Sequence, residues 1–288
     1  MPAEVLNNGP MLQVDNLSVT FGHGAYATRA VRDVSFALGR ERLGIVGESG
    51  SGKSTAGRAI MRLQPKGAQV HADALRFAGR DLLALREREL TRIRGRDMAL
   101  ILQDPRYSLN PVKPIGVQIA ESARVHLKLG SRAARKAALE MLAHVRIRDP
   151  ERTMALYPHE ISGGMGQRAM IAMMLLNKPK LVIADEPTSA LDVSVRQDVL
   201  TLLDGLVREN GSGLILISHD IRMVARFCDR ILVMYAGRVV EELHSLDEAA
   251  HPYTRGLIAS MPGFDGPRPH RLPVIDRASL AAFEEAAR

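Results

Sequence analysis

The segment GESGSGKST at residues 47–55 constrains this chain more than any other feature. It has the spacing of a phosphate-binding loop: a glycine, four residues, then glycine, lysine and serine or threonine. Glycines let the backbone turn its N–H groups toward phosphate oxygens, because no Cβ stands in the way. An apolar run at Arg42–Val46 precedes the segment and a helical pattern at Ser54–Leu63 follows it. This strand-loop-helix context favours a nucleoside triphosphate site over a flexible Gly/Ser linker.

Each residue type in this loop has a defined chemistry. The Lys53 ammonium can reach the β- and γ-phosphates, and the Ser54 hydroxyl can be a ligand of Mg²⁺. The helix that begins here adds the positive end of its dipole. The predicted nucleotide contacts are Gly47, Glu48, Ser49, Gly50, Ser51, Gly52, Lys53, Ser54 and Thr55.

Two adjacent acids, Asp185 and Glu186, follow the apolar run LVIA. Carboxylates next to a buried strand are costly unless they hold a metal or a hydrogen-bond network. We therefore expect Asp185 to bind Mg²⁺, directly or through water, and Glu186 to be the base that activates the attacking water. The alternative is that both acids merely begin a turn before Pro187. With a phosphate-binding loop in the same chain, the pair indicates hydrolysis and not binding alone.

Apolar runs of strand length alternate with helical patterns, which is typical of an α/β fold with a largely parallel sheet. Strand signal is missing between Pro105 and His159, where we predict a helical subdomain inserted at about residues 105–165. We expect one domain over residues 1–262 and a short C-terminal appendage, rich in Gly, Pro, Arg and His where it begins, over 263–288. The expected strands are Leu12–Thr20, Ala30–Leu38, Arg42–Val46, Met98–Leu102, Leu181–Ala184, Leu214–Ile217 and Ile231–Met234.

Composition excludes several classes of protein. The 288 residues are 46% apolar and 25% charged, which argues against a disordered or collagen-like chain. The single cysteine, Cys228, cannot form an internal disulfide, so a reducing compartment is expected. The longest apolar run, Ala169–Leu176, is too short to cross a membrane, and the N-terminus has no signal-peptide pattern. We expect a cytoplasmic chain that reaches a membrane through a partner.

The net charge of +7 suits an anionic partner such as a nucleotide, a nucleic acid or a membrane surface. The arginine-rich segment Arg86–Arg96 lacks the interleaved aromatics of a base-stacking surface and contains Glu87 and Glu89. We interpret it as a solvated helix, and no nucleic-acid partner is expected.

The motif ISGGMGQR begins a long apolar helix, and Ser162, Gly163 and Gly164 leave the helix N-terminus open to an anion. Taken alone, it is an ordinary helix cap. Six motifs resemble, in their order along the chain, those of ATP-binding cassette (ABC) ATPases, and the resemblance extends from Met11 to about Met234. They are GESGSGKST, LQDP, ISGGMGQR, LVIADEP, SALD and ISHD. The resemblance implies a P-loop NTPase cassette with a mainly parallel core sheet, an antiparallel β subdomain near the N-terminus and a helical subdomain.

The same resemblance implies roles for further residues. Gln103 would be the Q-loop glutamine, which senses Mg²⁺ and the attacking water and touches the membrane partner. His219 would be the switch histidine on the γ-phosphate, and Asp192 would belong to the loop that crosses the dimer. Phe21 would stack on adenine, with Tyr26 as the weaker candidate. In this family Ser162, Gly163 and Gly164 contact the ATP that a second cassette holds. Two departures are Ile161, where Leu is commoner, and Met165, where Gln is.

Three finer stretches, QDPRYSLNP, YPHEISGGM and HPYTRGL, resemble the importer ATPases for peptides and nickel. That group implies ATP and Mg²⁺, a second ATPase subunit, identical or not, two membrane permease subunits and an extracytoplasmic binding protein. The chain would be a peripheral ATPase on the cytoplasmic face of the inner membrane. Several peptide members hold an iron–sulfur cluster in cysteines after HPYT. Residues 252–288 contain none, so no cluster is expected, and the cargo leans slightly toward nickel, a metal chelate or another non-peptide compound. The alternative is a soluble ABC ATPase acting on nucleic acid or ribosomes.

Overall fold

The computed structural model describes residues 9–189 and 191–260, which form two compact units. The first unit comprises residues 9–81 and 216–260, and the second comprises residues 82–215. Residues 263–288, the predicted appendage, lie outside the described residues. Within the described part of the chain, no helix combines the length and the apolar character needed to cross a membrane.

An antiparallel sheet forms the N-terminal part of the first unit, as expected. Its order is β2-β1-β5-β6, and β4 pairs with β1 beside β5. The turn between β1 and β2 contains the short helix η1 (Gly24–Tyr26). The strands are β1 (Leu12–Phe21), β2 (Thr28–Leu38), β4 (Gln69–His71), β5 (Ala74–Phe77) and β6 (Arg80–Asp81).

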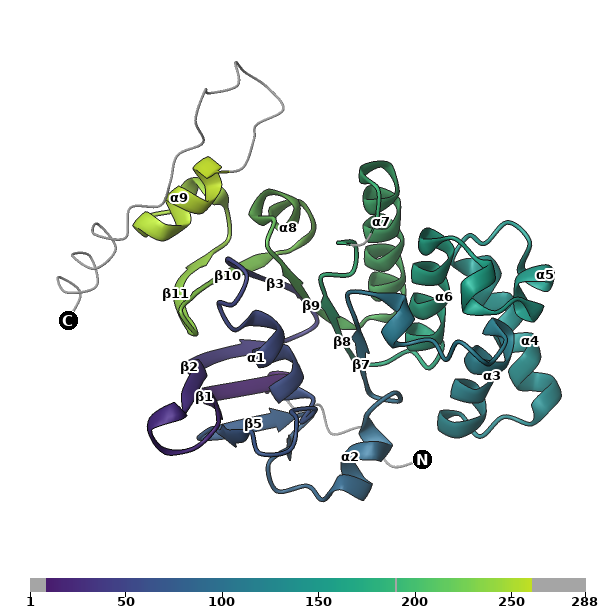
Figure 1. The fold of residues 1–288 in the computed structure, drawn as a ribbon, viewed down its shortest axis with the longest axis horizontal. Coiled ribbons are helices and arrows are strands. Elements are labelled where there is room, and N and C mark those ends of the chain that lie inside the picture. Colours follow the sequence, from purple (N-terminus) through teal and green to yellow (C-terminus); the bar gives the residue numbers. More distant parts are fainter. Residues whose placement is uncertain (1–8, 190, 261–288) are drawn as a thin grey trace, which may run out of the picture. The chain divides into compact units, whose positions relative to one another are not determined.

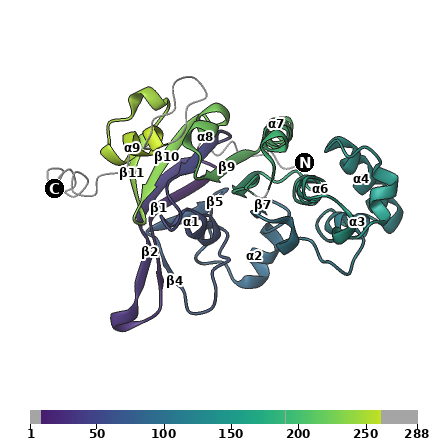
Figure 2. The same cartoon turned by 45° about the horizontal axis from the view of Figure 1, so that its top comes forward.

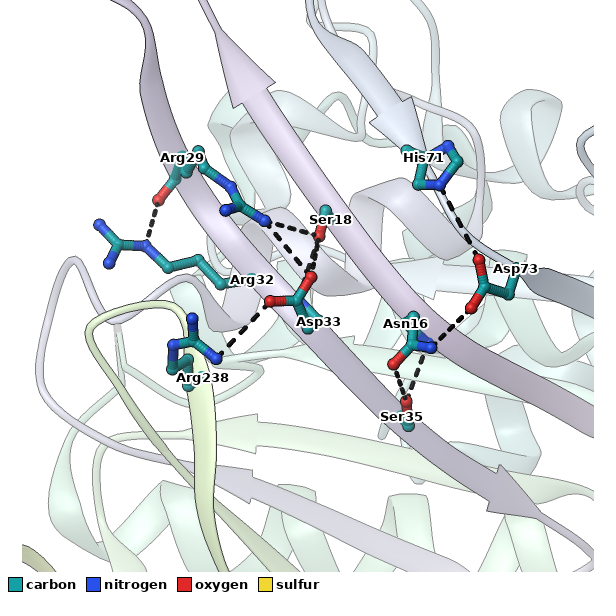
Figure 3. A network of polar contacts seen from close by, with 9 residues as sticks. All are labelled: Asn16, Ser18, Arg29, Arg32, Asp33, Ser35, His71, Asp73 and Arg238. Atoms are coloured by element: carbon teal, nitrogen blue, oxygen red, sulfur yellow. Dashed lines mark hydrogen bonds and ion pairs between the residues drawn. The ribbon is translucent and has the colours of Figure 1, made fainter. Parts of the chain in front are cut away.

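Register shifts interrupt the pairing of β1 with β2, and polar side chains stabilise them (Figure 3). Asn16 and Asp33 have φ values of 52° and 53°, a conformation that suits Asn and Asp better than most residues. The Asn16 N–H donates to Ser35 Oγ at 2.8 Å, and the Asp33 N–H donates to Ser18 Oγ at 3.0 Å. These bonds replace ladder bonds that the bulges remove.

The rest of the first unit contains β3 (Arg42–Val46), β10 (Arg230–Tyr235) and β11 (Arg238–Leu243). Strand β3 pairs with β10 in parallel, and β10 pairs with β11 as an antiparallel hairpin. Strand β9 (Gly213–Ser218) follows β3 in strand order. Its residues 216–218 belong to the first unit and its residues 213–215 to the second. The helices are α1 (Lys53–Ile60), α8 (Ile221–Phe227) and α9 (Pro252–Ser260), with η4 (Leu246–Glu248) before α9. Figure 1 shows α1 beside β1 and β2.

The second unit pairs β8 (Leu181–Asp185) in parallel with β7 (Met98–Ile101), and β9 follows β8 in strand order. All five residues of β8 are buried, which explains the apolar run LVIA that precedes Asp185. Both views show α3, α4 and α6 packed together (Figures 1 and 2). The helices of this unit are α2 (Glu87–Ile93), η2 (Pro105–Tyr107), α3 (Ile115–His126), α4 (Ser131–His144), α5 (Pro150–Ala155), η3 (Pro158–Glu160), α6 (Gly163–Leu175) and α7 (Val193–Asn210).

Each of the seven expected strands is present, with ends that differ by at most two residues. The expected helix at Ser54–Leu63 instead begins at Lys53 and ends at Ile60, because Arg62 has a φ of 54° and cannot continue it. The arginine-rich segment contains helix α2, which buries Leu90 and Ile93 and exposes Glu87, Arg88 and Arg92, as expected for a helix with one solvated face.

Candidate functional site

The phosphate-binding loop connects β3 to α1 in the first unit and has one packed side and one open side. A Cβ on Gly47 would lie 2.1 Å from the Met234 carbonyl oxygen, and one on Gly52 would lie 2.4 Å from that of Ala30. Both glycines have positive φ values, 152° and 100°. Gly50 also has a positive φ, 83°, but nothing lies within 4 Å of its Cβ position. The loop therefore needs glycine for close packing at Gly47 and Gly52, while Gly50 faces open space.

Lys53 lies buried in the first turn of α1 and folds back over its own loop. Its Nζ donates to the carbonyl oxygens of Gly47 at 2.8 Å and Glu48 at 2.7 Å, and to Ser51 Oγ at 3.4 Å. The ammonium is thus placed at the centre of the loop, where the positive end of α1 adds to its charge. Ser54 and Thr55 follow on α1, and both are half-buried.

Two other segments brace the loop. The Gly237 N–H in the β10–β11 turn donates to the Ser51 carbonyl at 3.0 Å. On α9, the buried Tyr253 hydroxyl accepts a hydrogen bond from the Glu48 N–H at 2.8 Å. Neither residue stands out in the sequence as part of the site. The signal for Tyr253 is the HPYT stretch, which by itself indicates only the importer subgroup.

The first unit also holds His219 and Phe21. His219 is exposed and follows β9 directly, ahead of α8. Asp220 fixes this turn, because its N–H donates to Ser218 Oγ at 3.0 Å and its carboxylate accepts from the Met223 N–H at 2.9 Å. Phe21 ends β1 and is half-buried, whereas Tyr26 is 91% exposed.

In the second unit, Asp185 and Glu186 lie at the carboxyl end of β8. Asp185 is buried and Glu186 is half-buried. Glu186 has a φ of 46°, a costly conformation for glutamate that is common at functional sites. Its carbonyl accepts from both the backbone N–H and the hydroxyl of Ser189, each at 3.2 Å. The turn therefore holds Glu186 at the point where the strand ends.

Gln103 is exposed and lies two residues after β7, in the same unit. The residue after it, Asp104, caps the turn η2 by accepting from the Arg106 N–H at 2.9 Å. An ion pair of 2.6 Å with the Arg106 side chain completes this link. Hydrogen bonds from the Arg106 guanidinium lower the pKa of Asp104 below its ordinary value of 3.8. The loop that carries Gln103 is thus fixed just beyond it by a charged pair.

Ser162 caps α6, and its Oγ accepts from the Met165 N–H at 3.3 Å. Gly164 is tightly packed, since a Cβ there would lie 3.1 Å from Val195 Cγ1 on α7. Asp192 is exposed and caps α7 through its carbonyl, which accepts from the N–H groups of Val195 and Arg196 at 3.0 Å each. The open end of α6 and the start of α7 are therefore neighbours.

A pocket of about 330 Å³ joins two of the predicted motifs within the second unit. The LQDP loop contributes Asp104 and Pro105, and the ISGGM segment contributes Ser162 and Gly163. Leu191, next to Asp192, completes this wall. Within the first unit the structure likewise gathers Lys53, Ser51 and Tyr253 at one loop. The remaining residues that line the pocket are Arg106, Leu109, Pro158, His159, Ile161 and Gly166.

Comparison with known proteins identifies this architecture. A family described as ABC transporter matches residues 31–189, more than half of the chain. A dimeric ATP-binding cassette, solved in a post-hydrolysis state with ADP and Pi, has a TM-score of 0.70 and 31% identity. The match covers 81% of this chain and 98% of that one. The fold class predicted from the sequence is therefore confirmed.

Two curated relatives are similar over most of their length. One, from Brucella abortus, is named as a peptide import ATP-binding protein; it is 46% identical, over 94% of this chain and 82% of its own. The other is the dipeptide transport ATP-binding protein DppD of Haemophilus influenzae, 46% identical over 88% of this chain and 78% of its own. The chain belongs to the ABC transporter family and is an ATPase of that family.

Proposed function

We propose that this chain is the ATP-hydrolysing subunit of a membrane importer and that its cargo is peptides. The phosphate loop between β3 and α1 carries the first part of this proposal. Its glycines exclude any side chain on the packed side, while Gly50 leaves the other side open for a phosphate chain. The names of the relatives support peptide cargo. Among the relatives reported above none is named for nucleic acid or ribosomes, so the soluble alternative has no support.

The absence of cysteine from residues 252–288 by itself leans toward nickel, a metal chelate or other non-peptide cargo. We favour peptides because the related proteins are named for peptide and dipeptide transport. Glutathione import, named for a relative from Pectobacterium atrosepticum that is 43% identical, involves cargo of the same chemical class. That relative is longer, and the chain spans 47% of it.

The donor atoms of the predicted metal residues fit Mg²⁺, which prefers oxygen ligands. Ser54 offers a hydroxyl, Asp185 a buried carboxylate and Gln103 an amide oxygen. When bound with ATP, the ion would neutralise charge on the phosphates. Lys53 would bind the phosphates, and Glu186 would accept the proton of the attacking water. His219 and Gln103 would contact the γ-phosphate and this water, and Phe21 would stack on adenine.

The partners follow from the same proposal. A second ATPase subunit would present its own serine and two glycines to the ATP held here, and Ser162, Gly163 and Gly164 would serve that subunit in return. Asp192 would lie at this dimer contact. Two permease subunits would dock on the second unit, where Tyr107 and Val112 are 82% and 77% exposed. An extracytoplasmic binding protein would deliver the cargo, and the chain would lie on the cytoplasmic face of the inner membrane.

The test is Glu186→Gln in the transporter complex purified from membranes, with Glu140→Gln on α4 as the matched control. We expect phosphate release to fall about 100-fold or more, the scale of a lost general base. ATP binding and ATP-driven pairing of the ATPase subunits should persist. Full turnover in Glu186→Gln would refute the role of Glu186. Failure of the wild type to bind ATP would refute the function, and mass spectrometry of the ligand held by the binding protein tests the cargo.

A further inference from the structure

The start of helix α9 reaches the phosphate loop from 205 positions away in the sequence. Tyr253, in the first turn of α9, is fully buried, and its hydroxyl accepts the Glu48 N–H at 2.8 Å. A tyrosine hydroxyl in the interior requires a partner, and a phenylalanine would fill the same space without one. This hydrogen bond therefore requires tyrosine and cannot be made by phenylalanine.

Several contacts fix the position of Tyr253. Its own N–H donates to His251 Nδ1 at 3.1 Å. One carboxylate oxygen of Glu241, on β11, accepts from the N–H groups of Ala250 and His251 at 2.7 and 2.9 Å. The Tyr253 ring packs on Tyr235, with the ring centroids 4.5 Å apart. Glu241 on β11 and the His251 ring thus fix the start of α9, and with it the Tyr253 hydroxyl.

The hydroxyl acts on one peptide group, the one that joins Gly47 to Glu48. Lys53 Nζ binds the carbonyl of this peptide at 2.8 Å, and Tyr253 binds its N–H at 2.8 Å. Both polar ends of the peptide are thereby fixed, at the point where the chain leaves β3 and enters the loop. Because the orientation of each following N–H depends on this peptide, its rotation would disturb the whole cradle.

We propose that Tyr253 is a positioning residue for ATP binding, which holds the Gly47–Glu48 peptide in the orientation that the phosphates require. This inference rests on the proposed function, since it assumes that the loop binds ATP. Burial raises the pKa of Tyr253 to about 12, so the hydroxyl stays neutral at physiological pH. Helix α9 is then part of the nucleotide site and not only a connection to the residues that follow it.

The experiment compares Tyr253→Phe with Tyr235→Phe, which removes a hydroxyl from the ring packed against it. ATP affinity is measured by calorimetry on the full-length protein, together with the exchange rate of the Glu48 amide proton by NMR. Loss of one neutral hydrogen bond predicts ATP binding about three- to tenfold weaker in Tyr253→Phe and faster exchange at Glu48. Tyr235→Phe should match the wild type in both measurements.

Equal ATP affinity and equal Glu48 exchange in the two variants would overturn the inference and leave the proposed function intact. Failure of the wild type and of Tyr235→Phe to bind ATP would overturn the proposed function instead. A purely structural role would lower stability without weakening ATP binding by the folded protein, so this outcome also counts against positioning. If Tyr253→Phe does not fold, an unprotected Glu48 amide in the wild type would overturn the inference.

Discussion

Two glycines of the phosphate loop offer a matched pair of substitutions, Gly50→Ala and Gly52→Ala. Both residues have positive φ values, 83° and 100°. They differ in the space around them. A Cβ on Gly52 would lie 2.4 Å from the backbone oxygen of Ala30, whereas a Cβ on Gly50 would meet nothing within 4 Å. The pair therefore separates the cost of backbone strain from the cost of a steric clash.

The magnitude follows from these two terms. An alanine held in a left-handed conformation costs about 1–2 kcal/mol, and both variants incur this cost. Gly52→Ala adds overpacking of about 1–3 kcal/mol, because a backbone oxygen cannot rotate away as a side chain would. We expect the free energy of unfolding to fall by about 1–2 kcal/mol in Gly50→Ala and by about 2–5 kcal/mol in Gly52→Ala.

The assay is equilibrium unfolding in urea without nucleotide, followed by far-ultraviolet circular dichroism. The comparison uses the difference between the two variants, which is less sensitive to the unfolded-state reference than either value alone. Both substitutions restrict the unfolded chain equally, so that contribution cancels. Equal losses in the two variants, or a larger loss in Gly50→Ala, would refute the division of the loop into a packed side and an open side.

Three further predictions concern other contacts. Ser162→Ala removes the side-chain cap that accepts the Met165 N–H and should lower the free energy of unfolding by about 0.5–1 kcal/mol, measured in urea. The bonds from Arg106 lower the pKa of Asp104 below 3.8, so their stabilisation is complete above pH 3.8 and is lost as the pH falls through the lower folded-state value. The free energies of unfolding of the wild type and of Asp104→Asn should therefore converge as the pH falls through this folded-state pKa. Burial raises the pKa of Tyr253 from 10 to about 12, so its stabilisation is complete below pH 10 and is lost between pH 10 and about 12. Between pH 10 and about 12, the free energy of unfolding should therefore fall less in Tyr253→Phe than in the wild type.

The first and third of these predictions have a control variant, and the second has an outcome that would contradict it. Ser131→Ala, at the first residue of α4 where Gly130 is the cap, should change stability less than Ser162→Ala. A constant difference between wild type and Asp104→Asn from pH 6 down to pH values well below 3.8 would contradict the second prediction. Tyr26→Phe, at a side chain that is 91% exposed, should retain the wild-type alkaline profile. A wild-type alkaline profile in Tyr253→Phe would contradict the prediction on Tyr253.

Strands buried on both faces were predictable because their sequence carries the signal without help from other parts of the chain. Strand β8 has five buried residues in a row, and its predicted range ended one residue before the observed one. The short strands β4 and β6 gave no such signal. They have three and two residues, and their side chains are mostly exposed and polar. Pairing with neighbours in the sheet, and not their composition, makes them strands.

The candidate site likewise contains residues that have a local sequence signal and residues that depend on tertiary packing. Spacing along the chain predicts the phosphate loop, Asp185 and Glu186 as site residues, because each stands next to a strand, and the family resemblance adds His219. It could not reveal that Tyr253 binds the Glu48 amide, since the two residues are 205 positions apart and neither forms part of a shared pattern. Nor could it show that Gly237 supports Ser51, which depends on the β10–β11 turn reaching the loop. Contacts of this kind arise from tertiary packing.

The contacts of Lys53 have a consequence for ligand selection. Its ammonium has three N–H donors, and three oxygen atoms of the loop, two carbonyls and one hydroxyl, lie within hydrogen-bond distance of it. A ligand that binds Lys53 must therefore compete with these oxygens. Charged phosphate oxygens can do so, because an anion attracts the ammonium more strongly than a neutral carbonyl or hydroxyl oxygen does. Neutral polar molecules offer the ammonium no more than the oxygens of the loop already do, so the internal contacts of Lys53 favour anions over uncharged competitors.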